Sequence, residues 1–155
     1  MEIRPATEGD VEPLVDDLWT PFMHELLADD PDAELAEGFR EDALEYRHEQ
    51  LEESGRIDRV ADADGTLLGY VSAEVQESPP VIDRGETLHI NEVYVRPDYR
   101  RDGLGDTLLA HAEEWGEREG CVRVTLTVDA PNEGAQTLYR EREFEITRHR
   151  MRKGL

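Results

Sequence analysis

Three arginines and two glycines lie within the short stretch from Arg96 to Gly105. Gly103 and Gly105 form a Gly-x-Gly at the start of an expected helix, where unpaired backbone amides and the positive end of the helix dipole favour an anion. Glycine also allows close approach to the backbone. Arg100 and Arg101 add positive charge, so the stretch predicts an anion site. It lacks the third glycine of a Rossmann motif and the Gly-Lys-Ser/Thr of a Walker A loop.

The surrounding chain must place this stretch between a strand and a helix. Apolar residues at steps of four and three predict a helix over residues 103–119, and Pro97 closes a strand over residues 87–95. Asp64-Gly65 predicts a turn between two strands within residues 56–75. The remaining expected elements are strands at 2–6, 122–128 and 144–151, a helical stripe from Leu14 to Leu26, and helices at 33–53 and 132–140.

Thr7 and Asp10 have the spacing of a capping box at the start of the first helix. The resulting element order is β-α-α-β-β-β-α-β-α-β. It predicts an α/β (α+β) fold in which helices flank a mixed central sheet. With no linker or internal repeat, we expect a single domain over residues 1–155.

The chain has 38 acidic and 17 basic residues, a formal net charge of −21. Such an imbalance weakens the compact state by self-repulsion unless counterions are plentiful, and halophilic proteins tolerate it. We therefore expect a soluble, cytoplasmic protein from a high-salt cell; an acidic surface that grips a basic partner is the alternative. No broad basic face is present to neutralise phosphates, so nucleic acid is not an expected partner.

Cys121 is the single cysteine, which predicts neither a disulfide framework nor a cysteine-based zinc site. The five histidines include no pair at a convincing ligand spacing, so no metal is expected. The first residues lack the apolar region of a signal peptide, and no apolar run reaches about 18 residues. A membrane is therefore not an expected partner.

Several motifs resemble the Gcn5-related N-acetyltransferase (GNAT) family. Arg100 to Gly105 is similar to that family's Gln/Arg-x-x-Gly-x-Gly/Ala loop, which holds the pyrophosphate of acetyl-coenzyme A (acetyl-CoA). "NEGAQTLYREREFE" resembles its second motif, with Glu143 in place of a glycine, which we expect to reshape a turn. The cofactor-binding residues implied by the resemblance are Val93, Tyr94, Val95, Arg100, Arg101, Asp102, Gly103, Leu104, Gly105, Asp106 and Asn132.

The resemblance also implies two catalytic residues. Tyr139 matches the tyrosine that protonates the coenzyme A thiolate, although it also fits an ordinary core aromatic. Glu92 resembles in placement the glutamate that takes the proton from the amine, although a structural or solvent-facing role fits it equally. His89 is a rival base, and Asn132 could also be only a helix N-cap.

The expected function is transfer of acetyl from acetyl-CoA to a primary amine by direct attack in a ternary complex. A backbone amide near Val93 or Tyr94 would stabilise the oxyanion. A cationic acceptor such as a polyamine, an aminoglycoside or a protein amine is expected near the first two helices. The resemblance allows a homodimer. A non-catalytic acetyl-CoA-binding module and an acidic interaction domain remain the alternatives.

Overall fold

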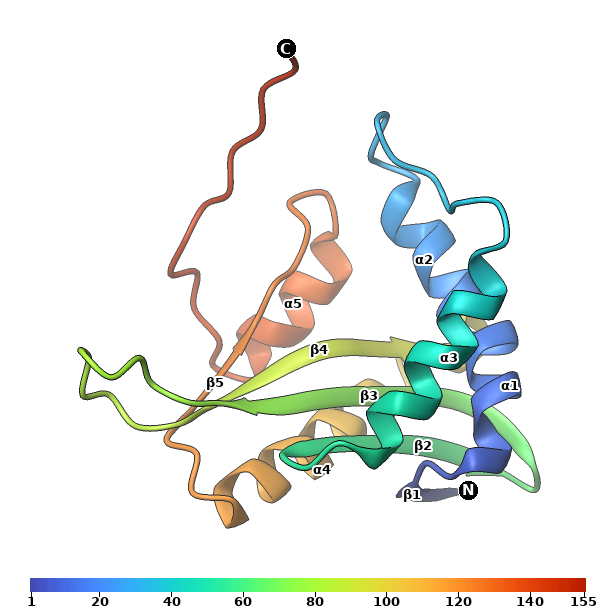
Figure 1. The fold of residues 1–155 in the computed structure, drawn as a ribbon, viewed down its shortest axis with the longest axis horizontal. Coiled ribbons are helices and arrows are strands. Elements are labelled where there is room, and N and C mark those ends of the chain that lie inside the picture. The colour runs from blue at the N-terminus through green and yellow to red at the C-terminus, as the bar shows by residue number, and fades with distance from the viewer.

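The computed structural model describes all residues from Met1 to Leu155 and is built around one five-stranded sheet (Figure 1). Its strands lie in the order β1-β2-β3-β4-β5, and the first four are antiparallel to their neighbours. β5 joins β4 in parallel, which makes the sheet mixed as expected. The strands are β1 (Glu2–Pro5), β2 (Arg56–Ala63), β3 (Thr66–Gln76), β4 (Thr87–Val95) and β5 (Arg123–Leu126).

Helices cover both faces of the sheet. On one face, α4 packs over β2, β3 and β4 and closes a core of 12 buried apolar residues, with α5 beside it. On the other face, the N-terminal helices and α3 cover a smaller core of 6 residues. The helices are η1 (Glu8–Asp10), α1 (Val11–Pro13), the π-helix η2 (Leu14–Trp19), α2 (Thr20–Leu27), α3 (Phe39–Glu52), η3 (Pro97–Tyr99), α4 (Leu104–Arg118) and α5 (Glu133–Glu141).

The predicted turn between β2 and β3 is confirmed at Asp64 and Gly65, which have φ values of 51° and 91°. These two positive values are those of a type I′ hairpin turn, which matches the twist of the flanking strands. The Asp62 carboxylate accepts a hydrogen bond from the Gly65 amide at 2.7 Å. The turn aligns β3, the central strand of the sheet, with β2.

The junction of β4 with β5 determines where a ligand can reach the sheet. β5 pairs with β4 only from Thr87 to Ile90. Immediately after Ile90, the pairing of β4 with β3 shifts by one residue, which leaves Asn91 as a bulge. Beyond the bulge the two strands diverge (Figure 1), so the rest of β4 has no strand partner on that edge.

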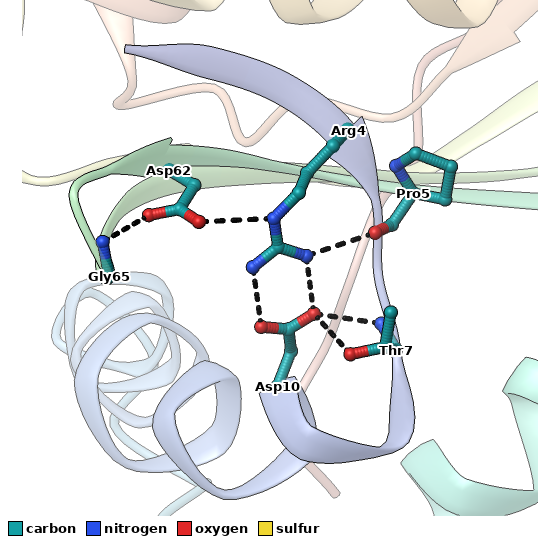
Figure 2. Close-up of polar contacts among 6 residues, drawn as sticks. All are labelled: Arg4, Pro5, Thr7, Asp10, Asp62 and Gly65. Atoms are coloured by element: carbon teal, nitrogen blue, oxygen red, sulfur yellow. Dashed lines mark hydrogen bonds and ion pairs between the residues drawn. The ribbon is translucent and has the colours of Figure 1, made fainter.

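Arg4 ties the N-terminal strand to its neighbours. Figure 2 shows its guanidinium between the carboxylates of Asp10, at 2.7 and 2.8 Å, and Asp62, at 3.1 Å. Asp10 also accepts hydrogen bonds from the amide and hydroxyl of Thr7. The predicted interaction of Thr7 with Asp10 at the first helical turn is therefore confirmed, and Arg4 adds a third partner to it.

Two sequence expectations are wrong. Residues 144–151 form no strand, because no strand edge of this chain lies beside them, and the segment instead leaves the body of the molecule (Figure 1). The second long helix begins at Phe39 rather than at residue 33, because Gly38 adopts a left-handed φ of 76° that ends the preceding loop. Pro31 lies within that loop and also disfavours helix at the residue before it.

Candidate functional site

The start of α4 presents unpaired backbone amides. Gly103 is its N-cap, with a left-handed φ of 82° and no capping side chain. The first helical hydrogen bond runs from the Thr107 amide to the Gly103 carbonyl at 3.0 Å, so the amides of Leu104, Gly105 and Asp106 have no partner in the helix. A Cβ atom on Gly103 would meet nothing within 4 Å. This open, uncapped helix start can accept an anion.

The three arginines of this stretch point in different directions. Arg100 donates to both carboxylate oxygens of Glu25 at 2.9 Å, and Arg96 lies 3.5 Å from Asp17. Both partners belong to the N-terminal helices, so these two arginines hold helices against β4. Arg101 is exposed, has a positive φ of 69° and makes no ion pair. It is the arginine whose charge is free at the helix start.

The other residues implied in cofactor binding contribute mainly backbone. The side chains of Tyr94, Val95 and Leu104 are buried in the two cores, and Val93 packs against one of them. Beyond the bulge at Asn91, however, the outer edge of β4 has no strand partner. Peptide groups on that edge can therefore accept an extended ligand as another strand would.

The acidic residues near the α4 start differ in their contacts. Asp102 is exposed and forms no ion pair. The Asp106 carboxylate lies 2.5 Å from Nη1 of Arg142, and Nη2 of the same arginine lies 2.6 Å from Glu113. Arg142 thereby fixes the end of α5 against α4. A Cβ atom on Gly105 would lie 3.5 Å from Leu138 of α5, an ordinary van der Waals contact.

Glu92 is held at both carboxylate oxygens. Nη2 of Arg47, from α3, lies 2.5 Å from one oxygen, and the Tyr70 hydroxyl donates to the other at 2.7 Å. The Arg47 side chain is 5% exposed and the Glu92 side chain 16%. Burial, followed by the nearby Glu92 charge, raises the pKa of Tyr70 well above its usual value, so this phenol keeps its proton. Each oxygen of Glu92 retains a second lone pair for a further donor.

Tyr139 lies half-buried on α5 with its hydroxyl unbonded. Its ring packs edge-on against Phe144, with centroids 5.7 Å apart. Burial raises the pKa of the phenol, so its proton stays in place until a strong acceptor arrives. Asn132 is the N-cap of this helix and accepts a hydrogen bond from the Ala135 amide at 3.1 Å. Asn132 is therefore a helix N-cap, as one of the two alternatives predicted, and its side-chain amide nitrogen remains available to donate a hydrogen bond.

His89, the rival base, has a structural contact. Its Nδ1 lies 2.9 Å from the Thr125 hydroxyl, across the β4–β5 pair. Both residues belong to the paired part of the two strands, before the bulge. His89 therefore links β4 to β5 in the region where they are still paired, before the two strands separate.

A hollow of about 580 Å³ lies between the end of α2 and the start of α3. His24 lines it, as does a pair of glutamates, Glu34 and Glu37. Nearby, Trp19 packs against Phe39 and Phe22 against Tyr94, and Tyr46 is 53% exposed. The hollow combines apolar walls with acidic groups, which suits an organic cation.

Glu143, which stands in place of the family's glycine, lies in the turn after α5. It adopts φ of 67°, a left-handed conformation that glycine accepts more readily, and the Phe144 amide still bonds to the Tyr139 carbonyl at 2.9 Å. The turn therefore places a non-glycine residue in a left-handed backbone conformation, which is strained. No group of three His, Cys, Asp or Glu side chains is arranged to hold a metal ion. No helix is both long and apolar enough to cross a membrane.

Sequence reasoning missed Arg47 and Tyr70 as partners of Glu92. The residues that α3 buries are Ala43, Arg47 and Gln50, whereas the aromatic Tyr46 is 53% exposed. Their spacing of four and three was the available signal. An arginine and a glutamine among charged neighbours gave no sign that this stripe faced the sheet.

Comparison with protein families gives a match over most of the chain. Residues 14–144 match the model of the acetyltransferase (GNAT) family. The chain is 31% identical over 86 residues to an uncharacterized N-acetyltransferase of Methanocaldococcus jannaschii, a match that covers 56% of this chain and spans 38% of that protein. It is 26% identical over 133 residues to an aminoglycoside N(6′)-acetyltransferase type 1 of Salmonella typhimurium, covering 84% of this chain and 86% of that protein.

A third relative, from Bacillus subtilis, bears the name putative [ribosomal protein bS18]-alanine N-acetyltransferase. It is 31% identical over 96 residues, covering 62% of this chain and 58% of that protein. Among solved structures, the aminoglycoside N-acetyltransferase AAC(6′)-Iy in complex with CoA has a TM-score of 0.75 at 20% identity. That alignment covers 99% of this chain and 93% of the other, which establishes a shared fold.

Proposed function

The chain is an acetyl-CoA-dependent N-acetyltransferase of the GNAT family, and we propose that it acetylates a primary amine by direct attack within a ternary complex. The observation that carries this proposal is the unpaired edge of β4 beyond Ile90, on the strand that leads to the uncapped start of α4. An extended donor with a phosphorylated end suits these two features together. We also propose that residues 1–155 form a single domain and that the protein works in a salt-rich cytoplasm.

In the proposed donor site, the amides of Leu104, Gly105 and Asp106 bind the pyrophosphate, with Arg101 as the free cation. Arg100 assists by fixing Tyr94 and the end of β4, since it lies over that ring and donates to the Val95 carbonyl at 2.8 Å. High salt screens the contribution of an exposed arginine more than that of oriented amides. Asp102 borders the loop.

The remaining donor contacts come from β4 and α5. The peptide groups of Val93, Tyr94 and Val95 would bind the pantetheine arm through the edge that no strand occupies. The side-chain nitrogen of Asn132 adds a contact, because its oxygen already caps α5. These contacts would lay the thioester along β4, where a backbone amide near Val93 or Tyr94 can stabilise the oxyanion.

The chemical step requires two proton movements. The neutral amine nitrogen forms a bond to the thioester carbon, the C–S bond breaks, and the thiolate leaves. We assign the amine proton to Glu92, directly or through water, since its oxygens retain free lone pairs. The thiolate receives the proton of Tyr139, whose hydroxyl has no competing partner.

The proposed acceptor is a cationic amine that enters from the side of α2 and α3. The acidic pair Glu34 and Glu37 at the hollow supports a substrate with more than one positive charge. The relatives favour two kinds of acceptor, an aminoglycoside and the α-amine of a protein. Loss of the proton from an α-amine is easier near pH 7, because its pKa of about 7.8 lies well below that of lysine.

The test is release of coenzyme A thiol from acetyl-CoA in molar KCl, with aminoglycosides, polyamines, lysine peptides and N-terminal peptides as acceptors. We expect Tyr139→Phe to lower kcat about 10²-fold, the scale of general acid catalysis, with donor affinity unchanged. Tyr46→Phe is the matched control, since Tyr46 is 53% exposed and lies on α3. Equal turnover by wild type and Tyr139→Phe would exclude this tyrosine as the acid.

The same assay separates the alternatives. A non-catalytic module would bind acetyl-CoA, with calorimetry as the readout, and would release no thiol with any amine. An acidic interaction domain would fail to bind the donor at all. A homodimer is a further part of the proposal, independent of the acceptor.

A further inference from the structure

Three neighbouring strands place polar side chains in one row on the face of the sheet that α3 covers (Figure 1). The register sets Asp58 of β2 opposite Ser72 of β3, and Ser72 opposite Glu92 of β4. Residues opposite one another across antiparallel strands project to the same face. Ser72 is fully buried. The row therefore holds two carboxylates, Asp58 and Glu92, with a buried serine between them.

Arg47 is the cation that both carboxylates share. Its side chain is 5% exposed, and its Nη2 atom lies 2.5 Å from Glu92. Its Nη1 atom donates to the side-chain oxygen of Gln50 at 3.3 Å, which helps to fix the guanidinium. Arg47 and Asp58 also line the same small cavity, of about 10 Å³. One buried guanidinium therefore interacts with both acidic side chains of the row.

This sharing affects how readily Glu92 can accept a proton. A buried arginine that loses its carboxylate partner becomes an uncompensated charge, which is costly. When Glu92 takes up a proton, Asp58 is the carboxylate that still compensates Arg47. Burial raises the pKa of Asp58, and the negative charge of Glu92 adds to that rise. Protonation of Glu92 therefore favours the ionised form of Asp58, and the negative charge of Asp58 in turn favours protonation of Glu92.

Tyr70 acts on Glu92 in the opposite sense. The Arg47 guanidinium lies over its ring, 5.4 Å from the centroid, and the residue is 1% exposed. The Tyr70 hydroxyl donates to the second oxygen of Glu92 at 2.7 Å. A hydrogen bond donated to a carboxylate stabilises its charged form. Tyr70 therefore opposes the uptake of a proton by Glu92, whereas the negative charge of Asp58 promotes it.

A second buried arginine, Arg56, belongs to the same row. Its side chain is 5% exposed, and it donates to the Ser72 hydroxyl at 2.9 Å and to the Glu74 carboxylate at 3.0 Å. Its charge is therefore compensated by Glu74 rather than by Glu92. The charged and titratable groups that face Glu92 from α3, β2 and β3 are thus Arg47, Asp58, Arg56 and Tyr70.

We propose that Asp58 and Tyr70 are positioning residues for the loss of the amine proton, Asp58 strengthening and Tyr70 weakening the affinity of Glu92 for that proton. This inference rests on the proposed role of Glu92 as the base. The proton passes from the amine nitrogen to an oxygen of Glu92, which becomes a neutral acid, while Arg47 keeps Asp58 as its counter-ion. Both residues act through Glu92. Buried charges are screened little by salt, so these effects persist in molar KCl.

The experiment follows the titration of the Glu92 carboxyl carbon by NMR, in the full chain in molar KCl without substrates. Glu92→Gln identifies the signal. Asp58→Asn removes a negative charge, so the titration midpoint of Glu92 should move to lower pH, and Asp58→Glu should restore it. Tyr70→Phe removes only the hydroxyl, so the midpoint should move to higher pH. The control is Asp62→Asn, the same substitution on the same strand at a residue that pairs with Arg4, and it should leave the midpoint unchanged.

Turnover gives a second readout, because the acidic limb of the pH profile of kcat/KM reports the essential base of the free enzyme. With one amine acceptor, this limb should shift in the same two directions, since the titration of the amine is common to all variants. Midpoints that do not move in Asp58→Asn and Tyr70→Phe, or that move the same way in both, would overturn this inference alone. Full turnover by Glu92→Gln would instead remove Glu92 as the proposed base, and this inference with it.

Discussion

The two faces of the sheet are stabilised by different interactions. Under α4 the core is apolar throughout, with Leu88, Leu108 and Leu109 fully buried. Under the N-terminal helices and α3 the apolar core is half that size, and charged groups are buried beside it. Arg47 lies there against Glu92 and over the Tyr70 ring, at 5.4 Å from its centroid. Apolar packing under α4 is non-directional, whereas the opposite face depends on specific ion-pair and hydrogen-bond partners.

The two faces correspond to the two substrates of the proposed reaction, the acetyl donor and the amine acceptor. The α4 face positions backbone amides, a task that requires a rigid support and little charge. The other face borders the proposed acceptor entrance, where acidic groups can bind a cation. β4 belongs to both, because Leu88 and Ile90 enter the apolar core while Glu92 and Tyr94 enter the polar side. A change on either face therefore acts on the same strand, to which we assign the proposed chemistry.

The largest effect should come from Arg47→Met, which leaves Glu92 as a buried, unpaired charge. We expect a loss of about 3–5 kcal/mol in unfolding free energy, the usual penalty for breaking a buried pair from one side. Urea denaturation measures it. The double variant Arg47→Met/Glu92→Gln should regain most of the loss, since glutamine still accepts from Tyr70. Equal losses in the single and double variants would show that the pair is not the cause.

Leu108→Ala should cost slightly less, about 3 kcal/mol, because it removes a fully buried side chain and leaves a cavity. Since no charge is involved, the loss should be the same at low and at molar KCl, measured by the denaturant midpoint at each salt concentration. A loss that changes strongly with salt would mean that the α4 face is not held by apolar packing alone.

Asp10→Asn should cost about 2 kcal/mol near pH 7, because its hydrogen bond to Arg4 lowers the folded-state pKa from 3.8 to about 2. With the folded pKa below the unfolded one, the stabilisation is complete above about pH 4 and is lost as pH falls through about 2. The measurement is the stability difference between wild type and variant as pH is lowered. A constant difference would exclude ionisation as its source.

The smallest effect should come from Arg40→Gln, which breaks an exposed pair with Asp16 at 2.8 Å. The Arg40 side chain is 49% exposed, so we expect only a small loss of stability at low salt and no measurable effect in molar KCl. Thermal unfolding at both salt concentrations would show it. A loss that persists in high salt would indicate that Arg40 contributes through packing between α3 and η2.

Local patterns in the sequence predicted the parts of the fold that depend on neighbours along the chain. The spacing of Leu104, Leu108 and Ala112 placed α4, and Asp64-Gly65 placed the β2–β3 turn. The uncapped Gly-x-Gly was also predicted, because helix starts follow local rules. The expected strand over 144–151 was wrong, since a strand also needs an edge to pair with, and no local pattern along the chain supplies that edge.

The candidate site was predictable to a similar degree. Gly103, Asn132 and Tyr139 lie on the predicted elements, and Asn132 caps its helix. The direction of Arg100 was not predictable, because its partner Glu25 is 75 residues away in the chain. Arg47 and Glu92 are separated by 45 residues, and no local pattern relates them.

The sequence by itself thus determined most of the elements, the glycine-rich helix start and the family, all of which depend on residues close together along the chain. The tertiary structure alone decided which charges were already neutralised. Charge acts through space, so Arg100 and Glu92 acquired their partners only when α2 and α3 packed against β4. For the same reason, only the tertiary structure shows that Arg101 is the unpaired arginine at the α4 start, because Arg96 and Arg100 pair with carboxylates of the N-terminal helices.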